Sequence, residues 1–182
     1  MALLDTPLFE HGRTMPDFTL ADPDGRSHAM REHLGGKGLL VAFLCNHCPY
    51  VKAIADRLAE DADALMAEGV GVLAVMSNDY RDYAADSPPQ MKRMAERHGW
   101  RFPYLVDEDQ AVGGAWGAVC TPDFFGLNAK GELHYRGRLD DARMGGGTDR
   151  RRELVEAMRQ IAETGEGPRE QLPSMGCSIK WR

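Results

Sequence analysis

Long hydrophobic runs are missing from this chain, although 43% of its 182 residues are hydrophobic. A helix that crosses a membrane needs about 20 consecutive apolar residues, and no stretch of this sequence reaches that length. The N-terminal segment 1–5 also lacks the basic group and the apolar core of a signal peptide. We therefore expect a cytoplasmic protein with no membrane partner.

Positive charge is scarce as well. The chain has 22 Lys and Arg against 28 Asp and Glu, which gives a formal net charge of −6. Proteins that bind nucleic acid through its phosphates carry a basic face, so the composition argues against a nucleic-acid partner. The only dense basic cluster, Arg150-Arg151-Arg152, opens a predicted helix, and charge runs of this kind are typical of a solvated helix face.

Cysteine is the third scarce residue, with four in the chain. That number is too small for a secreted scaffold held together by disulfides. In a reducing compartment a close cysteine pair is more often catalytic or metal-binding than structural. Such a pair is present in the segment Cys45-Asn46-His47-Cys48-Pro49.

The sequence around this pair predicts a junction between a strand and a helix. The unbroken apolar run 38–44 is typical of a buried strand. Apolar residues then recur at helical spacing from Val51 to Leu65. Free backbone N–H groups and the helix dipole favour an anion at a helix N-terminus, and they lower the pKa of a thiol placed there. Because the second thiol follows one helical turn later, the layout predicts a dithiol redox site.

The remaining patterns predict a mixed α/β domain. Apolar runs indicate strands at 18–20, 70–76, 123–127 and 133–136, and helical spacing indicates helices over 88–98, 112–116 and 154–162. Ser87 is a predicted N-cap with Gln90 as its capping-box partner. An early βαβ unit and a late hairpin predict a mixed sheet with helices on both faces. We expect one domain over residues 1–182, with an irregular C-terminal tail at 166–182 packed on it.

Several motifs, taken in order, resemble the thioredoxin superfamily and, within it, a peroxiredoxin-like group of the AhpC/TSA branch that carries a thioredoxin-type C-x-x-C. The segments that carry the resemblance are Met15-Pro16-Asp17-Phe18-Thr19-Leu20, Cys45 to Val51, Phe102-Pro103-Tyr104-Leu105-Val106-Asp107, Gly137-Arg138-Leu139-Asp140-Asp141 and Gly176 to Trp181. The resemblance covers nearly the whole chain. It implies a thioredoxin-like fold of three α/β/α layers with an added N-terminal hairpin.

The resemblance also assigns roles to residues. It implies that Cys45 is the exposed attacking thiol and Cys48 the resolving thiol, with Asn46, His47 and Pro49 in support. It further implies that the Thr121–Pro122 bond is cis and lies against the disulfide, which would leave the Thr121 backbone free to pair with an extended substrate.

The sequence departs from the family patterns at four places. Leu44 stands where thioredoxins have a tryptophan before the first cysteine, and Leu39 stands where they have a buried acid, so proton transfer to the second thiol must use another group or water. Aligning Cys48 with the peroxidatic cysteine puts Val41 and Cys45 at the proline and threonine positions of P-x-x-x-T-x-x-C. Both residues that support rapid peroxide reduction are therefore absent.

Three further residues have open roles. His47 is either an exposed spacer or a group that stabilises the Cys45 thiolate and makes the disulfide more oxidising. Cys120 fits a small buried hydrophobic residue. Cys177 is either a tail thiol packed under Trp181 or a third redox thiol that exchanges with the pair.

The function that fits these observations is a thiol–disulfide oxidoreductase that uses the Cys45/Cys48 couple without a metal or an organic cofactor. Its partners would be a disulfide-bearing protein or small molecule and a cellular thiol reductant. One alternative is a weak thiol peroxidase with an antioxidant role. Another is a non-catalytic metal-binding or redox-sensing module, in which Cys120 and Cys177 would have to join the pair to complete a zinc site.

Overall fold

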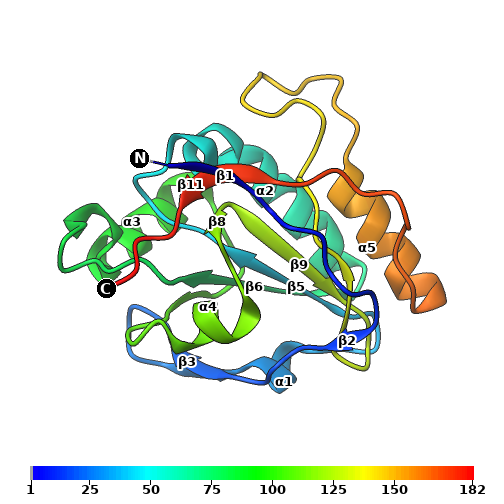
Figure 1. The fold of residues 1–182 in the computed structure, drawn as a ribbon, viewed down its shortest axis with the longest axis horizontal. Coiled ribbons are helices and arrows are strands. Elements are labelled where there is room, and N and C mark those ends of the chain that lie inside the picture. The colour runs from blue at the N-terminus through cyan, green and yellow to red at the C-terminus, as the bar shows by residue number, and fades with distance from the viewer. Residues whose placement is uncertain (1) are drawn as a thin grey trace.

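The computed structural model describes residues 2–182 and shows a large mixed sheet with helices on both faces (Figure 1). Within those residues the sheet has eight strands in the order β2-β10-β9-β5-β6-β7-β3-β4. β5, β6 and β7 run parallel, and β9 is antiparallel to β5. The strands are β2 (Arg13–Thr14), β3 (Thr19–Ala21), β4 (Ser27–Ala29), β5 (Leu39–Phe43), β6 (Gly71–Met76), β7 (Tyr104–Val106), β9 (Asp123–Leu127) and β10 (Glu132–Tyr135).

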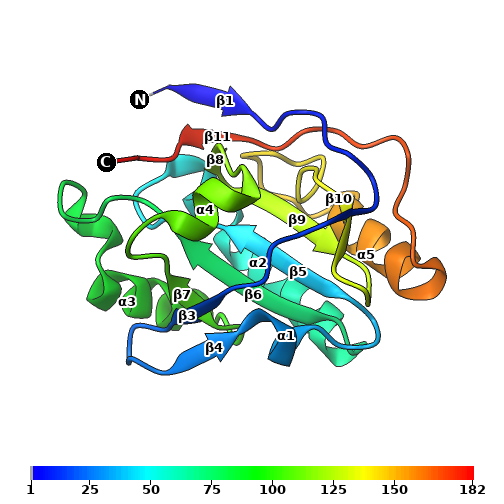
Figure 2. The same ribbon diagram turned by 60° about the horizontal axis from the view of Figure 1, so that its bottom comes forward.

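Two helical layers cover this sheet, as the sequence predicted (Figures 1 and 2). Leu40 and Ala42 of β5 pack with α2, α3 and α5 on one face, whereas Leu39, Val41 and Phe43 pack with α1 and α4 on the other. No helix among the described residues has both the length and the apolar character needed to cross a membrane. The helices are α1 (Met30–His33), α2 (Pro49–Ala67), the 3-10 helix η1 (Ala84–Asp86), α3 (Pro88–His98), α4 (Ala111–Trp116) and α5 (Glu153–Thr164).

The predicted N-terminal hairpin is formed by β3 and β4, which pair antiparallel. The predicted strand–helix junction is also present, because β5 ends at Phe43 and α2 begins at Pro49. β5 is buried along its whole length, between the parallel strand β6 and the antiparallel strand β9. The loop that carries the two cysteines is therefore anchored at the carboxyl end of a rigid central strand.

The tail 166–182 is not irregular throughout, which corrects the sequence-based expectation. It contains strand β11 (Met175–Ser178), which lies between β1 (Leu3–Asp5) and β8 (Cys120–Thr121) in a second, three-stranded sheet (Figure 1). Both pairings of β11 are antiparallel. A strand this short has no hydrophobic period to detect, and its neighbours in space decide its conformation.

The basic cluster at the start of α5 is a solvated face only in part, because the Arg151 side chain is 67% exposed, as expected, whereas the Arg150 side chain is buried. The Arg150 side chain is only 4% exposed and forms ion pairs with Asp61 of α2 and with Asp140. Asp61 also pairs with Arg152, and Asp140 also pairs with Arg57. The network links α2 to the loop before α5, and sequence patterns could not show it because its members come from distant segments.

Candidate redox site

Cys45 and Cys48 lie in the loop between β5 and α2, and both are buried, with 1% and 0% of their surfaces exposed. The expectation of an exposed Cys45 is therefore wrong. Cys48 is the N-cap residue of the 19-residue helix α2, and Pro49 occupies its first turn. The side chain of Cys48 makes no capping hydrogen bond, but the main-chain N–H of Val51, one of the free donors of that turn, helps to lower the pKa of the Cys48 thiol.

Both thiols converge on Thr121, which lies more than seventy positions later in the chain. The Sγ atom of Cys45 lies 3.2 Å from the Thr121 hydroxyl, and the Sγ atom of Cys48 lies 3.2 Å from the Thr121 carbonyl oxygen. The predicted cis Thr121–Pro122 bond is confirmed. The Thr121 backbone is not free, however, because Cys177 of β11 is its partner in the antiparallel pair.

Asp86 is the main residue of the site that the sequence analysis missed. Its carboxylate is fully buried at the end of η1 and accepts four hydrogen bonds. Oδ1 accepts the main-chain N–H groups of Asn46 and His47 at 2.6 and 3.2 Å. Oδ2 accepts the Nδ2 group of Asn78 at 2.9 Å and lies 2.6 Å from Nδ1 of His47. Asp86 thus fixes the two residues between the cysteines.

A sequence signal for Asp86 existed. The residue directly precedes the predicted N-cap Ser87 and follows the strand that is parallel to β5. Because the carboxyl ends of parallel strands meet at one edge of a sheet, a carboxylate in this connection is well placed to reach the cysteine loop.

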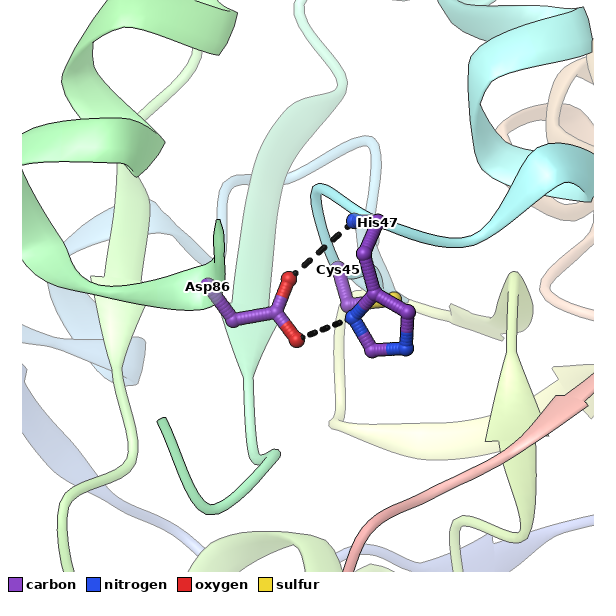
Figure 3. Close-up of side chains that lie close together, drawn as sticks. All are labelled: Cys45, His47 and Asp86. Carbon is purple, nitrogen blue, oxygen red and sulfur yellow. Dashed lines mark hydrogen bonds and ion pairs between the residues drawn. The ribbon is translucent and has the colours of Figure 1, made fainter. Parts of the chain in front are cut away.

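His47 is bound to Asp86 by two hydrogen bonds, and Cys45 lies beside this pair (Figure 3). Donor atoms of Cys45, His47 and Asp86 all lie within 4.8 Å of one another. The imidazole stacks on the ring of Tyr83 at 5.3 Å between centroids, and its Nε2 atom is buried without a hydrogen-bond partner among residues 2–182. Held in this way, the ring is an oriented group and not an exposed spacer.

Asn46 has a supporting position. Its Nδ2 group donates to the carbonyl of Ala85, and its Oδ1 atom accepts a hydrogen bond from the hydroxyl of Tyr104 at 3.1 Å. Ala85 belongs to η1, and Tyr104 belongs to β7. The loop between the cysteines is therefore tied down at each of its two central residues.

The electrostatics of the pair differ from the expectation of a Cys45 thiolate. The interaction with Cys48, burial and the nearby carboxylate of Asp86 raise the pKa of Cys45. The thiol of Cys45 lowers the pKa of Cys48 to about 4, against the effect of burial, and the Cys177 thiol and the main-chain N–H groups of Val51 and Cys177 contribute further. The negative charge of the reduced pair therefore belongs on Cys48.

Asp86 itself remains ionised. Burial alone would raise the pKa of Asp86, but the hydrogen bonds from His47 and Asn78, the charge of His47 and the N–H of Asn46 outweigh it and lower the pKa. A carboxylate that stays ionised can hold the imidazole of His47 in one orientation through the Nδ1 atom of the ring.

The other two cysteines lie close by. Cys120 is fully buried, and burial raises its pKa, as expected for an inert core thiol. Cys177 is 4% exposed and belongs to the same hydrophobic cluster as Cys45 and Cys48. The structure thus gathers three sulfurs at one point and holds Cys120 on the adjacent strand β8.

Cys45, His47 and Asp86 are also residue types that zinc accepts as ligands. Each Asp86 oxygen already has two N–H partners in this structure. A cation would have to displace part of that set, including the bond to His47. The geometry therefore fits proton handling better than metal binding.

A cavity of about 260 Å³ lies between the start of α2 and β11, lined by Pro122 but by neither cysteine of the pair. Apolar groups dominate its lining, among them Tyr50, Ile54, Pro122 and Leu172, and Arg138 and Arg143 also border it. It could hold an apolar side chain of a partner next to Pro122.

Comparison with known proteins identifies the family. The AhpC/TSA family model matches residues 11–136. The chain belongs to the AhpC/TSA family. It is 28% identical over 122 residues to the thiol–disulfide oxidoreductase ResA of Geobacillus thermodenitrificans, across 67% of this chain and 66% of ResA. It is also 28% identical over 131 residues to peroxiredoxin Bcp of Escherichia coli, across 72% and 78% of the two chains.

Solved structures agree with this assignment. An uncharacterized conserved protein from Geobacillus kaustophilus is 38% identical, with a TM-score of 0.93 over 100% of this chain and 97% of the other. The thioredoxin domain of a thiol–disulfide oxidoreductase from Bacteroides vulgatus shares the fold at a TM-score of 0.60 and 17% identity, over 71% and 89% of the chains. The predicted thioredoxin-like fold and the predicted class, a thiol–disulfide oxidoreductase, are confirmed.

Proposed function

We propose that this protein reduces disulfides with Cys48 as the attacking thiolate and Cys45 as the resolving thiol, the reverse of the order that the family resemblance implied. The observation that carries the proposal is the position of the two sulfurs. Cys48 caps the N-terminus of α2, whereas Cys45 lies beside the ionised Asp86. A helix N-terminus stabilises a thiolate and a neighbouring carboxylate opposes one.

The first step is attack of the Cys48 thiolate on a sulfur of the substrate disulfide. The substrate S–S bond breaks, a mixed disulfide forms on Cys48, and the departing thiolate takes a proton from solvent. In the second step Cys45 loses its proton and attacks Cys48. The reduced substrate leaves and the Cys45–Cys48 disulfide remains, to be reduced again by a cellular thiol.

His47 is the group placed to receive the Cys45 proton. It lies next to Cys45, and Asp86 orients the ring through Nδ1 and stabilises the positive charge that the imidazole acquires. This pair supplies the proton transfer for which the sequence offered no residue, since the acid position of thioredoxins holds the buried Leu39.

The burial of the two sulfur atoms and the apolar cavity beside Pro122 support a protein substrate. Neither sulfur is exposed, so a partner must displace part of the cover over Thr121 before exchange. The apolar cavity beside Pro122 suits a hydrophobic side chain next to the reacting cysteine of a protein substrate. A cytoplasmic location and an antioxidant role fit this chemistry and form part of the proposal.

The roles of the two cysteines are tested by trapping. Cys45→Ser and Cys48→Ser are each made together with Cys177→Ser and incubated with an excess of a small aromatic disulfide. We expect a stable mixed disulfide on Cys48 in the Cys45→Ser protein and almost none in the Cys48→Ser protein. Trapping on Cys45 instead would restore the order that the resemblance implied. A Cys120→Ser protein is the matched control and should behave like the parent.

Metal analysis separates the proposal from a metal-binding module. We expect the purified protein to retain less than stoichiometric zinc after dialysis against a chelator and to form a reducible disulfide. One tightly held zinc per chain without a reducible disulfide would replace the enzymatic role with a structural one.

A further inference from the structure

The end of the chain occupies the main-chain edge where a substrate was expected to pair. In the antiparallel pairing of β11 with β8, Cys177 is opposite Thr121 and Ser178 is opposite Cys120. Residues opposite each other in such a pair have Cα atoms about 4.5 to 5.5 Å apart. The Cys48 sulfur lies 3.2 Å from the Thr121 carbonyl. Cys48 and Cys177 therefore approach the same main-chain unit, one from α2 and one from β11.

Close packing holds β11 in this place. A Cβ atom on Gly176 would lie 1.9 Å from the Thr121 carbonyl oxygen, so no other residue allows this approach. The hydroxyl of Ser174 donates to the Pro122 carbonyl at 2.7 Å on one side of Cys177. On the other side, the N–H of Ile179 donates to the Val119 carbonyl at 3.1 Å.

We propose that Cys177 is a third redox-active thiol, which exchanges with the Cys45–Cys48 disulfide to form a Cys48–Cys177 disulfide. The inference rests on the proposed function and extends it, because it makes Cys48 the shared sulfur of two alternative disulfides. The thiol of Cys177 and its main-chain N–H both interact with the Cys48 sulfur in the reduced protein. Cys120, by contrast, directs its thiol toward the Pro122 carbonyl at 3.7 Å.

The exchange needs no external oxidant. The Cys177 thiolate attacks Cys48, the Cys48–Cys177 bond forms, and the Cys45–Cys48 bond breaks with its electron pair left on Cys45. The proton that Cys177 loses goes to solvent, and Cys45 takes one up from the adjacent His47, which solvent then reprotonates. The number of disulfides is unchanged. The disulfide that lay within the loop before α2 is thereby replaced by one that joins this loop to strand β11.

Peptide mapping tests this exchange directly. Trypsin cleavage after Lys37 and Lys52 places both redox cysteines in peptide 38–52, and cleavage after Arg169 and Lys180 places the third in peptide 170–180. The full-length protein is equilibrated in glutathione buffers of graded potential, alkylated and digested. Cross-linked 38–52 and 170–180 peptides report the new disulfide, and an internal loop within 38–52 reports the Cys45–Cys48 disulfide.

Cysteine-to-serine variants identify the two sulfur atoms that form the cross-link. Cys45→Ser removes the competing bond, so we expect the cross-linked peptides to become the dominant oxidised species. They should persist in Cys45→Ser with Cys120→Ser and disappear in Cys45→Ser with Cys177→Ser. Glutathione adducts on Cys48 in place of the cross-link in all three proteins would overturn the role of Cys177.

The Cys177→Ser single variant keeps the two proposals separate. Formation of the internal 38–52 disulfide in this variant is required by the proposed function. If that disulfide forms while the Cys45→Ser protein gives no cross-link, only the exchange with Cys177 is wrong. If that disulfide fails to form in a Cys177→Ser protein whose circular dichroism matches the parent, the proposed function is wrong as well.

Discussion

Nδ1 of His47 lies 2.6 Å from Oδ2 of Asp86, although the two residues are 39 positions apart in the chain. The same carboxylate also receives the main-chain N–H of His47 and of Asn46. The segment between the two cysteines is thus built around a buried negative charge. This charge orients the imidazole and contributes, after the interaction with Cys48 and burial, to the raised pKa of Cys45.

Asp86→Asn should destabilise the protein and slow resolution. An asparagine can keep one oxygen for the N–H groups of Asn46 and His47, but its NH₂ group would face the two donors that now share Oδ2. Leaving buried donors unpaired costs about 1–3 kcal/mol, which denaturant unfolding will measure. Asp82→Asn, at an exposed position of the same connection, is the control and should change little. Unaltered stability in both variants would show that the bonds to Asp86 are not formed in solution.

The reduced protein should hold one thiolate, on Cys48, across about pH 5 to 8. A pKa of about 4 means that Cys48 is deprotonated above that pH, while the raised pKa of Cys45 keeps its proton in place. Ultraviolet thiolate absorbance, titrated downward from neutral pH, should therefore fall only in the acid range. Cys45→Ser should retain that absorbance, since a serine hydroxyl still donates to Cys48, and Cys48→Ser should lose it. A signal that survives in Cys48→Ser would place the thiolate on another residue.

His47→Ala should slow the resolving step by about 100-fold, the usual size of a general-base contribution, and leave the first attack on the disulfide nearly unchanged. The two steps are resolved by rapid mixing with a chromogenic disulfide, because the first releases one thiol and the second releases another. His98→Ala is a suitable control. Nδ1 of His98 on α3 lies 2.7 Å from Oδ1 of Asp56 on α2, so the two residues form a comparable pair away from the thiols. Equal rates for His47→Ala and the parent would remove the imidazole from the mechanism.

Oxidation by hydrogen peroxide should be slow beside disulfide exchange. Rapid peroxidases hold the peroxide with placed donors, and the positions of the supporting proline and threonine are Val41 and Cys45 in this chain. Val41 is buried in β5 and offers no polar group, although a thiolate can still be oxidised without such support. Stopped-flow measurement of both reactions on the reduced protein decides the point. A peroxide rate that exceeds disulfide exchange, with a sulfenic acid trapped on Cys48, would favour the peroxidase alternative, to which the similarity with peroxiredoxin Bcp also points.

The sequence was informative wherever local periodicity decided the structure. The apolar run before Cys45 and the helical spacing after Cys48 correctly predicted β5 and α2. The cis Thr121–Pro122 bond was correctly implied by the family resemblance and not by periodicity. The predicted helix over 154–162 corresponds to α5, whose C-cap Gly165 has the left-handed conformation typical of a C-terminal glycine. By contrast, Ser87 is the N-cap of α3 but makes no side-chain hydrogen bond to the helix, so the predicted capping box is absent.

The features that escaped prediction depend on contacts between distant segments. Asp86 reaches the cysteine loop only because β5 and β6 are adjacent, and Arg150 is buried only because Asp61 faces it from α2. β11 becomes a strand through its two neighbours and not through its own sequence. The proposed order of the two thiols belongs to the same group, because one of the charges that acts on Cys45 comes from the distant residue Asp86.

The position of β11 has a consequence for competition between substrates. A strand attached to the same chain is present at an effective concentration in about the millimolar range. An external peptide that pairs with the main chain of Thr121 must displace β11, which already occupies that position. The apparent affinity of the peptide is therefore lower than it would be for a free edge. Small disulfides, which need no strand pairing, avoid that competition. A protein substrate must add binding energy elsewhere, and the apolar cavity beside Pro122 is the nearest surface that could supply it.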